Sequence, residues 1–328
     1  MQELVSSFPP HFPAAVFIVL HISPDSPSIL PQILSRAGAL PAKHAEDGEP
    51  VRSGQIFVAP PDRQMTIQDG HVRVRRGPRE NRHRPAVDPL FRTAARSYDS
   101  RVIGIILSGH LDDGAAGLYV VRTLGGIGIV QDPTTAGASQ MPQSALQYGG
   151  ADYVLRKSDI GPQVVELVTN CRRSTMNVRS SERTRPKDET EENLEVSRPS
   201  EGNGTPSAFS CPECGGVLWE LHDGELVRFR CRVGHSYTMS VLAEEQREAA
   251  ENALWAAMRS LEEKAALAIR IAESTHDLRL SERMREQANA HRHHAETIRN
   301  MLLANGTNAK PPKREQGKEV FEESKVLP

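Results

Sequence analysis

Four residues in the second half of the 328-residue chain have the types and spacing of a metal site. Cys211, Cys214, Cys231 and His235 form the pattern Cys-x2-Cys-x16-Cys-x3-His. Zinc prefers four thiolate and imidazole ligands in a tetrahedron, and two short turns joined by a hairpin can present them in this way. Because all four ligands come from the protein, we expect a closed, structural zinc site with no position for a catalytic water.

Other assignments of these side chains remain open from the sequence. The three cysteines could be reduced and unpaired beside a chance histidine. His222 could replace His235 as the fourth ligand, although it lies at the turn of the expected hairpin. His291, His293 and His294 could form a second metal cluster, but a solvated helix face is the simpler interpretation.

His21 and Asp113 each lie in a loop that follows an expected parallel strand. In open α/β sheets, ligands bind at the carboxyl ends of the strands, so both positions suit a functional site. A loop histidine can also be merely solvated or capping. Asp112 or Asp113 could cap a helix that begins near Gly114, and capping is compatible with a place in a catalytic triad.

Alternating strands and helices must position these loops. Apolar runs rich in β-branched residues predict buried parallel strands at 16–20, 56–59, 102–107, 127–130 and 153–155. Helical patterns lie between and after them at 27–37, 88–97, 114–124, 141–148 and 160–171. This alternation predicts an α/β fold with a doubly wound, mostly parallel sheet. Asp69-Gly70 between two short runs predicts a β-hairpin excursion.

The composition changes along the chain and predicts five segments. They are an α/β domain (1–171), a disordered linker (172–209), a small zinc-ribbon-like module (210–238), an α-helical hairpin or coiled coil (239–305) and a disordered tail (306–328). The linker holds almost no large apolar residue and therefore cannot offset its ordering entropy. In the helical hairpin we expect a turn at 274–281, with Ser281 as the N-cap of the second helix.

Charge and hydropathy exclude several classes of protein. The chain has 40 Lys and Arg against 42 Asp and Glu, and a net charge of −2 argues against a globally basic nucleic-acid binder. The apolar run at 14–20 is far shorter than a membrane span, and residues 1–13 hold no Lys or Arg as a signal peptide would. Four cysteines are too few for a disulfide framework in a chain of this length. We therefore expect a cytoplasmic protein that does not insert into membranes.

Five segments together resemble the catalytic domain of CheB-type chemotaxis protein-glutamate methylesterases. They read Val-Leu-His-Ile-Ser-Pro (19–24), Ile-Phe-Val-Ala-Pro-Pro-Asp-Arg (56–63), His-Arg-Pro-Ala-Val-Asp-Pro-Leu-Phe-Arg (83–92), Ile-Leu-Ser-Gly-His-Leu-Asp-Asp-Gly-Ala-Ala-Gly (106–117) and Gln-Met-Pro-Gln-Ser-Ala (140–145). The resemblance is dense from about residue 14 to residue 157. The cysteine module and the helices after it resemble the C-terminal extension of CheB-like proteins that lack a receiver domain.

The resemblance implies a Ser-His-Asp hydrolase that cleaves glutamyl methyl esters on methyl-accepting chemoreceptors, and some members of the family also deamidate glutamines. His21 matches the catalytic histidine, which would take the serine proton and return it to methoxide. Asp113 matches the aspartate that orients the histidine and stabilises its cation. The backbone N–H of His110 is a candidate oxyanion donor. The resemblance implies no cofactor for catalysis, and it implies chemoreceptors as partners, with a methyltransferase or a kinase as further candidates in a phosphorelay.

The chain departs from the family at the nucleophile. The family carries its serine in a Gly-x-Ser-x-Gly-Gly stretch ahead of the histidine strand, and this chain contains no such stretch. Ser6 and Ser7 match the end of the helix after the nucleophile loop, and no motif supports Ser23 or Ser108. We expect an N-terminally truncated sequence that lacks the first strand and the nucleophile loop; a degenerate paralogue is the alternative.

Two functions follow from these observations. The first is a chemotaxis protein-glutamate methylesterase that is inactive as written because the nucleophilic serine is absent. The second is a non-catalytic scaffold that binds partners through the zinc module and the helical hairpin. A serine in a Gly-x-Ser-x-Gly-Gly context ahead of Met1 would distinguish the two. The receiver domain with its phosphoacceptor aspartate does not occur in the sequence, which therefore carries no evidence for control by phosphorylation.

Overall fold

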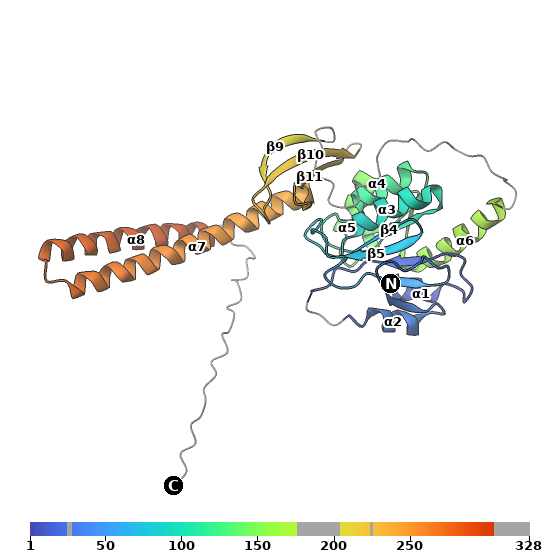
Figure 1. Cartoon of the computed structure of the whole chain (residues 1–328), viewed down its shortest axis with the longest axis horizontal. Coiled ribbons are helices and arrows are strands. Elements are labelled where there is room, and N and C mark those ends of the chain that lie inside the picture. Colours follow the sequence, from blue (N-terminus) through green and yellow to red (C-terminus); the bar gives the residue numbers. More distant parts are fainter. Residues whose placement is uncertain (25–27, 176–203, 224–225, 305–328) are drawn as a thin grey trace, which may run out of the picture. The chain divides into compact units, whose positions relative to one another are not determined.

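The computed structural model describes residues 1–24, 28–175, 204–223 and 226–304 of the chain (Figure 1). The chain divides into two compact units, Met1–Gln246 and Arg247–Pro328. Most of the expected linker, residues 176–203, and all of the expected tail, residues 306–328, lie outside the described residues. The division into five segments therefore stays a prediction.

Parallel strands form the centre of the first unit, as the apolar runs predict. They are β1 (Val16–Ile18), β2 (Ala42–His44), β3 (Ile56–Val58), β6 (Ile103–Ile106), β7 (Ile127–Gln131) and β8 (Tyr153–Leu155). Their hydrogen bonds make two three-stranded parallel sheets, in the orders β1-β3-β2 and β6-β7-β8. The structure thus confirms a parallel α/β architecture, although its strands pair as two sheets where we expected one.

One face of these strands packs on three helices. Ile18, Val58 and Ile129 from the strands are buried in one cluster with residues of α1 (Gln2–Ser6), α2 (Leu30–Ala37) and α6 (Lys157–Thr175). Both sheets contribute to this cluster, so they share one core. Successive strand residues point to opposite faces, which leaves Phe57 and Val130 for the other side.

The opposite face packs on the helices that carry the candidate site. These are α3 (Val87–Tyr98), α4 (Ala115–Thr123) and α5 (Gln140–Ser144), together with the hairpin β4 (Gln64–Gln68) and β5 (His71–Arg75). The hairpin forms at the predicted residues because Asp69 and Gly70 both adopt positive φ, at 50° and 73°. Single turns η1 (Asp99–Arg101) and η2 (Pro133–Thr135) and the π-helical turn η3 (Ala145–Gly149) complete the connections.

The cysteine module is a four-stranded antiparallel sheet within the first unit. Its strands β9 (Thr205–Ser210), β10 (Val217–Asp223), β11 (Leu226–Cys231) and β12 (Ser236–Thr238) are ordered β12-β11-β10-β9. The expected hairpin is present as β10 and β11. Two ends of the expected linker are regular structure instead: residues 172–175 extend α6, and most of β9 lies before residue 210.

Two long helices make the expected helical hairpin, α7 (Met239–Ser274) and α8 (Leu278–Ala304) (Figure 1). Buried Ala265, Ala268 and Ala288 let the helices approach closely, and Glu262 forms an ion pair with Arg299. Ser281 is not the N-cap, so that prediction was wrong. The Asp277 carboxylate accepts the N–H groups of the next helix, while the Ser281 hydroxyl donates to the carbonyl of Ala272. Among the described helices, none has an apolar stretch that would cross a lipid bilayer.

Candidate active site and metal centre

His21 and Asp113 meet across the sheet edge, although they are 92 residues apart in sequence. His21 follows β1 and Asp113 lies between β6 and α4, so each stands at the carboxyl end of a parallel strand. The Nε2 atom of His21 lies 2.7 Å from Oδ2 of Asp113. Asp113 is fully buried, whereas the His21 side chain is 21% exposed. A buried carboxylate therefore holds a histidine that solvent can reach.

The Asp113 carboxylate sits at the N-terminus of α3. It accepts the backbone N–H of Val87 at 2.7 Å and that of Asp88 at 3.2 Å. Burial alone would raise the pKa of Asp113, but the hydrogen bond and charge of His21 and the Val87 N–H lower it below its usual value. The free N–H groups and the dipole of a helix N-terminus favour an anion at this point.

Neither aspartate of the loop caps the helix that follows it. Gly114 is the N-cap residue of α4, with no side-chain hydrogen bond to the helix N-terminus. Asp88 supplies that contact instead, because its Oδ1 accepts the N–H of Gly117 at 2.6 Å. Each aspartate thus contacts the N-terminus of the other helix. Asp113, which precedes α4, accepts from the N-terminus of α3, and Asp88 of α3 accepts from the first turn of α4.

Asp88 is the member of this carboxyl pair that takes up a proton more readily. Its complete burial and the nearby charge of Asp113 raise the pKa of Asp88 to about 7. The Asn81 side-chain amide donates to Asp88 Oδ2 at 3.0 Å and to Asp113 Oδ1 at 3.4 Å. The environment therefore separates two neighbouring carboxyl groups into a charged one that faces His21 and one that is readily protonated.

A second imidazole stacks on the first. The rings of His21 and His83 are 3.6 Å apart at their centroids and only 3° from parallel. Burial and the positive charge that His21 can carry lower the pKa of His83 to about 4. His83 is therefore neutral near pH 7 and provides a flat face that fixes the plane of the His21 ring.

The orientation of His21 determines which nitrogen is available for proton transfer. Its Nε2 is engaged by Asp113, and within the described residues no hydrogen bond is formed to its Nδ1. Nδ1 is thus the nitrogen that could exchange a proton with a nucleophile. A histidine held by a carboxylate through one nitrogen, with the other nitrogen accessible, is the arrangement of a general acid and base.

No described serine hydroxyl is hydrogen-bonded to His21. The hydroxyl groups of Ser6 and Ser7 donate to the carbonyl of Glu3 in α1. The backbone N–H of Ser108 donates to the side chain of Gln131. The structure therefore brings two members of the expected triad together, and none of the described serine hydroxyl groups joins them through a hydrogen bond.

His110 lies in the same loop as Asp113 and is exposed. Its ring Nδ1 lies 3.2 Å from Oε1 of Gln140, which also accepts the N–H of Leu111 at 3.2 Å. Gln140 thus holds the turn that carries His110. The role of the His110 backbone N–H as an oxyanion donor stays a prediction.

The four expected metal ligands converge. One ligand atom from each of Cys211, Cys214, Cys231 and His235 lies within 4.8 Å of the others. Cys214 Sγ is 3.6 Å from Cys231 Sγ, and His235 Nδ1 is 3.5 Å from Cys231 Sγ and 3.6 Å from Cys211 Sγ. Ligands at bond lengths of about 2.0–2.3 Å on the corners of a tetrahedron are roughly 3.5–3.8 Å apart. The residues present therefore fit zinc in both chemistry and spacing.

Two similar turns present these ligands. The N–H of Gly215 donates to the carbonyl of Cys211, and the N–H of Gly234 donates to that of Cys231. Both glycines have positive φ, at 70° and 107°, which an L side chain rarely adopts. Outside the four ligands, Oε2 of Glu213 lies 3.1 Å from Nε2 of His235 and fixes the orientation of that ring.

The other histidines considered as ligands do not join a cluster. His222 lies against Glu220, with Nε2 and Oε1 3.0 Å apart. His293 and His294 have ring centroids 6.3 Å apart. Among the residues that the structure describes, the cysteine cluster is the only group of three or more ligand atoms. The second metal cluster is therefore absent from the described part of the chain.

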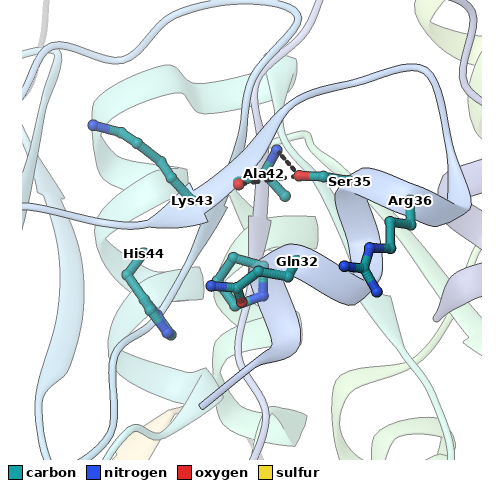
Figure 2. A pocket seen from close by; sticks show the side chains of 7 residues that line it. Gln32, Ser35, Arg36, Ala42, Lys43 and His44 are labelled. Atoms are coloured by element: carbon teal, nitrogen blue, oxygen red, sulfur yellow. Dashed lines mark hydrogen bonds between the residues drawn. The ribbon is translucent and has the colours of Figure 1, made fainter. Parts of the chain in front are cut away.

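A shallow hollow of about 400 Å³ lies between α2 and β2 (Figure 2). Gln32, Arg36, Lys43 and His44 line it, and Ser35 ties the two elements together through the backbone of Ala42. Neither His21, Asp113 nor any of the four metal ligands belongs to this lining. The hollow is separate from both candidate sites.

Sequence reasoning did not identify Asn81, His83 and Asp88 as site residues. His83 and Asp88 occur in one of the family-like segments, so their motif was visible while their role was not. Nothing in the local pattern shows that this segment lies against His21, because that contact depends on the tertiary fold.

Comparisons with known proteins assign a family to the α/β part of the chain. A family model described as CheB methylesterase matches residues 1–164. A Leptospira interrogans protein, provisionally named protein-glutamate methylesterase/protein-glutamine glutaminase, is 36% identical over 171 residues, which cover 52% of this chain and 89% of that protein. The protein-glutamate methylesterase/protein-glutamine glutaminase of Thermotoga maritima is 36% identical over 172 residues, covering 51% of this chain and 50% of that protein. The crystal structure of the Thermotoga maritima CheB methylesterase catalytic domain matches with 35% identity and a TM-score of 0.47, over 50% of this chain and 90% of that one.

Proposed function

The chain belongs to the CheB methylesterase family, and from this premise we propose that it hydrolyses glutamyl methyl esters on chemoreceptors by a Ser-His-Asp mechanism. The observation that carries the proposal is the 2.7 Å contact between His21 Nε2 and Asp113 Oδ2 at the carboxyl ends of two parallel strands. Deamidation of receptor glutamines uses the same attack on a glutamyl carbonyl and belongs to the same proposal.

Asp113 acts on the histidine and not on the substrate. Its lowered pKa keeps it ionised, and the helix N-terminus of α3 holds its oxygens in place. An ionised carboxylate next to Nε2 stabilises the imidazolium that forms when His21 takes up a proton. It also keeps the proton on Nε2 in the neutral ring, so that Nδ1 has a free lone pair.

His21 then moves one proton in each half-reaction. As the serine oxygen attacks the ester carbonyl, Nδ1 accepts the hydroxyl proton and passes it to the departing methoxide, which leaves as methanol. In the second half, His21 takes a proton from a water molecule as the water oxygen attacks the carbonyl carbon of the acyl-serine. The bond from that carbon to the serine oxygen then breaks, His21 returns the proton to the serine oxygen, and the glutamate side chain is released. Backbone N–H groups of the His110 turn are our candidates for stabilising the oxyanion.

The nucleophile is the part that the given sequence does not supply. Its 328 residues contain no Gly-x-Ser-x-Gly-Gly, the stretch in which the family carries its serine. We therefore expect no hydrolysis by these 328 residues alone. The same chain should become active when a segment with this stretch is joined ahead of the histidine strand.

The test is the release of methanol from methylated chemoreceptors. The chain as given should release none above background, and the chain extended by a family segment with the serine should release it. The matched control carries the same segment with that serine replaced by alanine, which keeps the added strand but removes the hydroxyl. If both extended chains are inactive although folded, the proposed activity is wrong.

We also assign structural zinc to Cys211, Cys214, Cys231 and His235. Bound zinc would cross-link the two turns that carry these ligands and so hold the small sheet together. It takes no part in ester hydrolysis in this proposal.

A non-catalytic role is the second candidate. It is favoured by the absence of the serine stretch and by the large exposed side chains on the helical hairpin, among them Leu267, Leu278 and Leu303. In this case the zinc module and the hairpin bind signalling partners such as a methyltransferase or a kinase. Inactive extended chains, as described above, would favour this candidate. A cytoplasmic location is part of both proposals.

A further inference from the structure

We propose that Asn81 is a positioning residue for Asp113, and that the zinc-binding module determines the position of Asn81 through strand β12. The inference rests on the proposed role of Asp113. The further inference is that a metal site distant in sequence from His21 and Asp113 helps to hold these two residues in their relative position.

Asn81 connects the two sites through its side-chain amide and its backbone N–H. It is 2% exposed and has a φ of 48°, a conformation that asparagine tolerates better than most residues. Its side-chain NH2 donates to Asp88 and Asp113, and its side-chain carbonyl accepts the N–H of Thr238 at 3.2 Å. Its backbone N–H donates to the carbonyl of Ser236 at 2.9 Å. Only one orientation of the amide can satisfy two carboxylates on one side and an N–H donor on the other.

Strand β12 and the start of α7 also contact the loop that carries Asp113. Asp112 is 2% exposed, and its Oδ2 accepts the hydroxyl of Thr238 at 2.6 Å and also that of Ser240. Leu111, with a φ of 62°, packs against the apolar core of the module. Consecutive residues thus face different parts of the unit: Leu111 and Asp112 contact the module, and Asp113 contacts His21.

The segment around Asn81 has further contacts with the module and with the first turns of α7, which follows it. Arg82 forms an ion pair with Glu245 at 2.5 Å, and the N–H of Ser236 donates to the carbonyl of Arg79. The next residue, His83, is the one that stacks on His21. One short segment is therefore bound by the module and in turn presents both Asn81 and His83 to the histidine–aspartate pair.

The metal ligands adjoin the strand that makes these contacts. Ser236 follows the ligand His235 directly, and the Tyr237 hydroxyl lies 3.3 Å from Sγ of Cys211. The strand itself has only three residues, paired with β11. So short a strand has little stability of its own, and zinc bound at His235 would fix its start. Loss of the metal should therefore release Thr238 and, through Asn81, loosen the Asp113 carboxylate.

The test uses the full chain and the low-field NMR signal of the proton between His21 Nε2 and Asp113, which needs no nucleophile or substrate. The signal is assigned by its loss in His21→Gln. We expect it in the zinc-loaded chain, and we expect it to disappear or broaden when a chelator removes zinc and to return when zinc alone is added back. Asn81→Gly, which keeps the positive φ, should remove the signal while zinc remains bound.

Milder and matched variants guard against simple unfolding. The double variant Thr238→Val with Ser240→Ala removes the hydroxyl contacts to Asp112 and should shift the signal without loss of zinc. Ser207→Ala, whose hydroxyl donates within the module to the carbonyl of Leu218, should leave it unchanged. A signal that is unaffected by zinc removal, by Asn81→Gly and by the double variant would overturn the inference and leave the proposed function standing. Absence of the signal in the unmodified, zinc-loaded chain would instead contradict the histidine–aspartate pair itself.

Discussion

At the scale of single residues, the site separates charges that would otherwise repel. Asp88 and Asp113 are both fully buried and share the Asn81 amide. His21 and the α3 N-terminus keep Asp113 ionised, while burial and Asp113 together favour protonation of Asp88. Protonation of Asp88 lowers the cost of burying two carboxyl groups together, and Asp113 keeps its charge beside four hydrogen-bond donors.

Asp113→Asn should affect both stability and chemistry. The amide cannot accept from His21 Nε2–H and from two helix N–H groups in the same way, and it carries no charge for the helix N-terminus. We expect a loss of about 1–3 kcal/mol in the free energy of unfolding, measured by urea denaturation. In the chain extended with the serine segment, the rate of methanol release should fall on the order of 10³–10⁴-fold. The exposed Asp159→Asn is the control, and equal effects of the two substitutions would contradict the role given to Asp113.

His83 should make the protein less stable in mild acid. Its pKa is about 4 in the folded chain and about 6.5 when unfolded, so the unfolded state binds more protons between these values. The stability due to neutral His83 is complete above pH 6.5 and is lost progressively as the pH falls toward 4. The difference in the free energy of unfolding between the unmodified chain and His83→Gln should therefore change across this window. The exposed His11→Gln serves as control, and a difference independent of pH would refute the burial argument.

The sequence located part of this site for physical reasons. His21 and Asp113 follow strongly apolar strand runs, and loops at the carboxyl ends of parallel strands meet in space. Asn81 could not be found in this way, because its contacts reach Asp113 and Thr238, both distant in the chain. A buried polar network of this kind has no periodic pattern in the sequence.

At the scale of elements, the strands with a strong turn signal or an apolar run could be predicted from the sequence, and the strands without such a pattern could not. The hairpin β4–β5 forms at the predicted residues because Asp-Gly is a strong turn signal, and β8 coincides with its apolar run. β2, with the sequence Ala-Lys-His, and β12, with Ser-Tyr-Thr, carry no apolar run and were not predicted. Both exist because a neighbouring strand supplies their hydrogen bonds.

The close approach of α7 and α8 depends on small side chains. Ala288 is fully buried against Ala265 and Ala268, whereas Ala290 on the same helix is exposed. Ala288→Leu should overpack this contact and lower the free energy of unfolding of the helical unit by about 1–3 kcal/mol, followed by helical circular dichroism. Ala290→Leu is the matched control and should cost little, since it adds the same side chain to the exposed face. Equal effects of both would show that the helices do not meet at Ala288.

The zinc assignment belongs to this scale as well, because the metal would hold a whole sheet. Metal analysis of the purified chain should find one zinc per chain, and Cys231→Ser should lose it together with the ordered amide signals of β10 and β11. Cys171→Ser, at the cysteine outside the set of four ligands, should keep both. A chain that contains no zinc and retains the folded sheet in the presence of a chelator would contradict the assignment.

At the scale of the whole molecule, the chain combines a family domain with a cysteine module and a helical hairpin that the family model does not match. The family model ends at residue 164, and the first compact unit continues to Gln246 because the cysteine module packs on the loops of the candidate site. The second unit is made of α8 and most of α7, with a repeating pattern that predicted the pair of helices. The α/β class and the family could be recognised from the sequence, whereas the contact between the module and the Asp113 loop could not, since it depends on β12, which no pattern predicted.

The central claim is that His21, held by Asp113, moves the proton in ester hydrolysis. The most direct measurement compares His21→Ala and His83→Ala in the serine-extended chain, by methanol release from methylated receptors. The two rings are stacked, so each substitution removes one imidazole from the same stacked pair. Of the two histidines, only His21 is hydrogen-bonded to Asp113. We expect His21→Ala to abolish hydrolysis and His83→Ala to retain a measurable part of it. Hydrolysis that continues unchanged in His21→Ala would show that His21 does not move the proton.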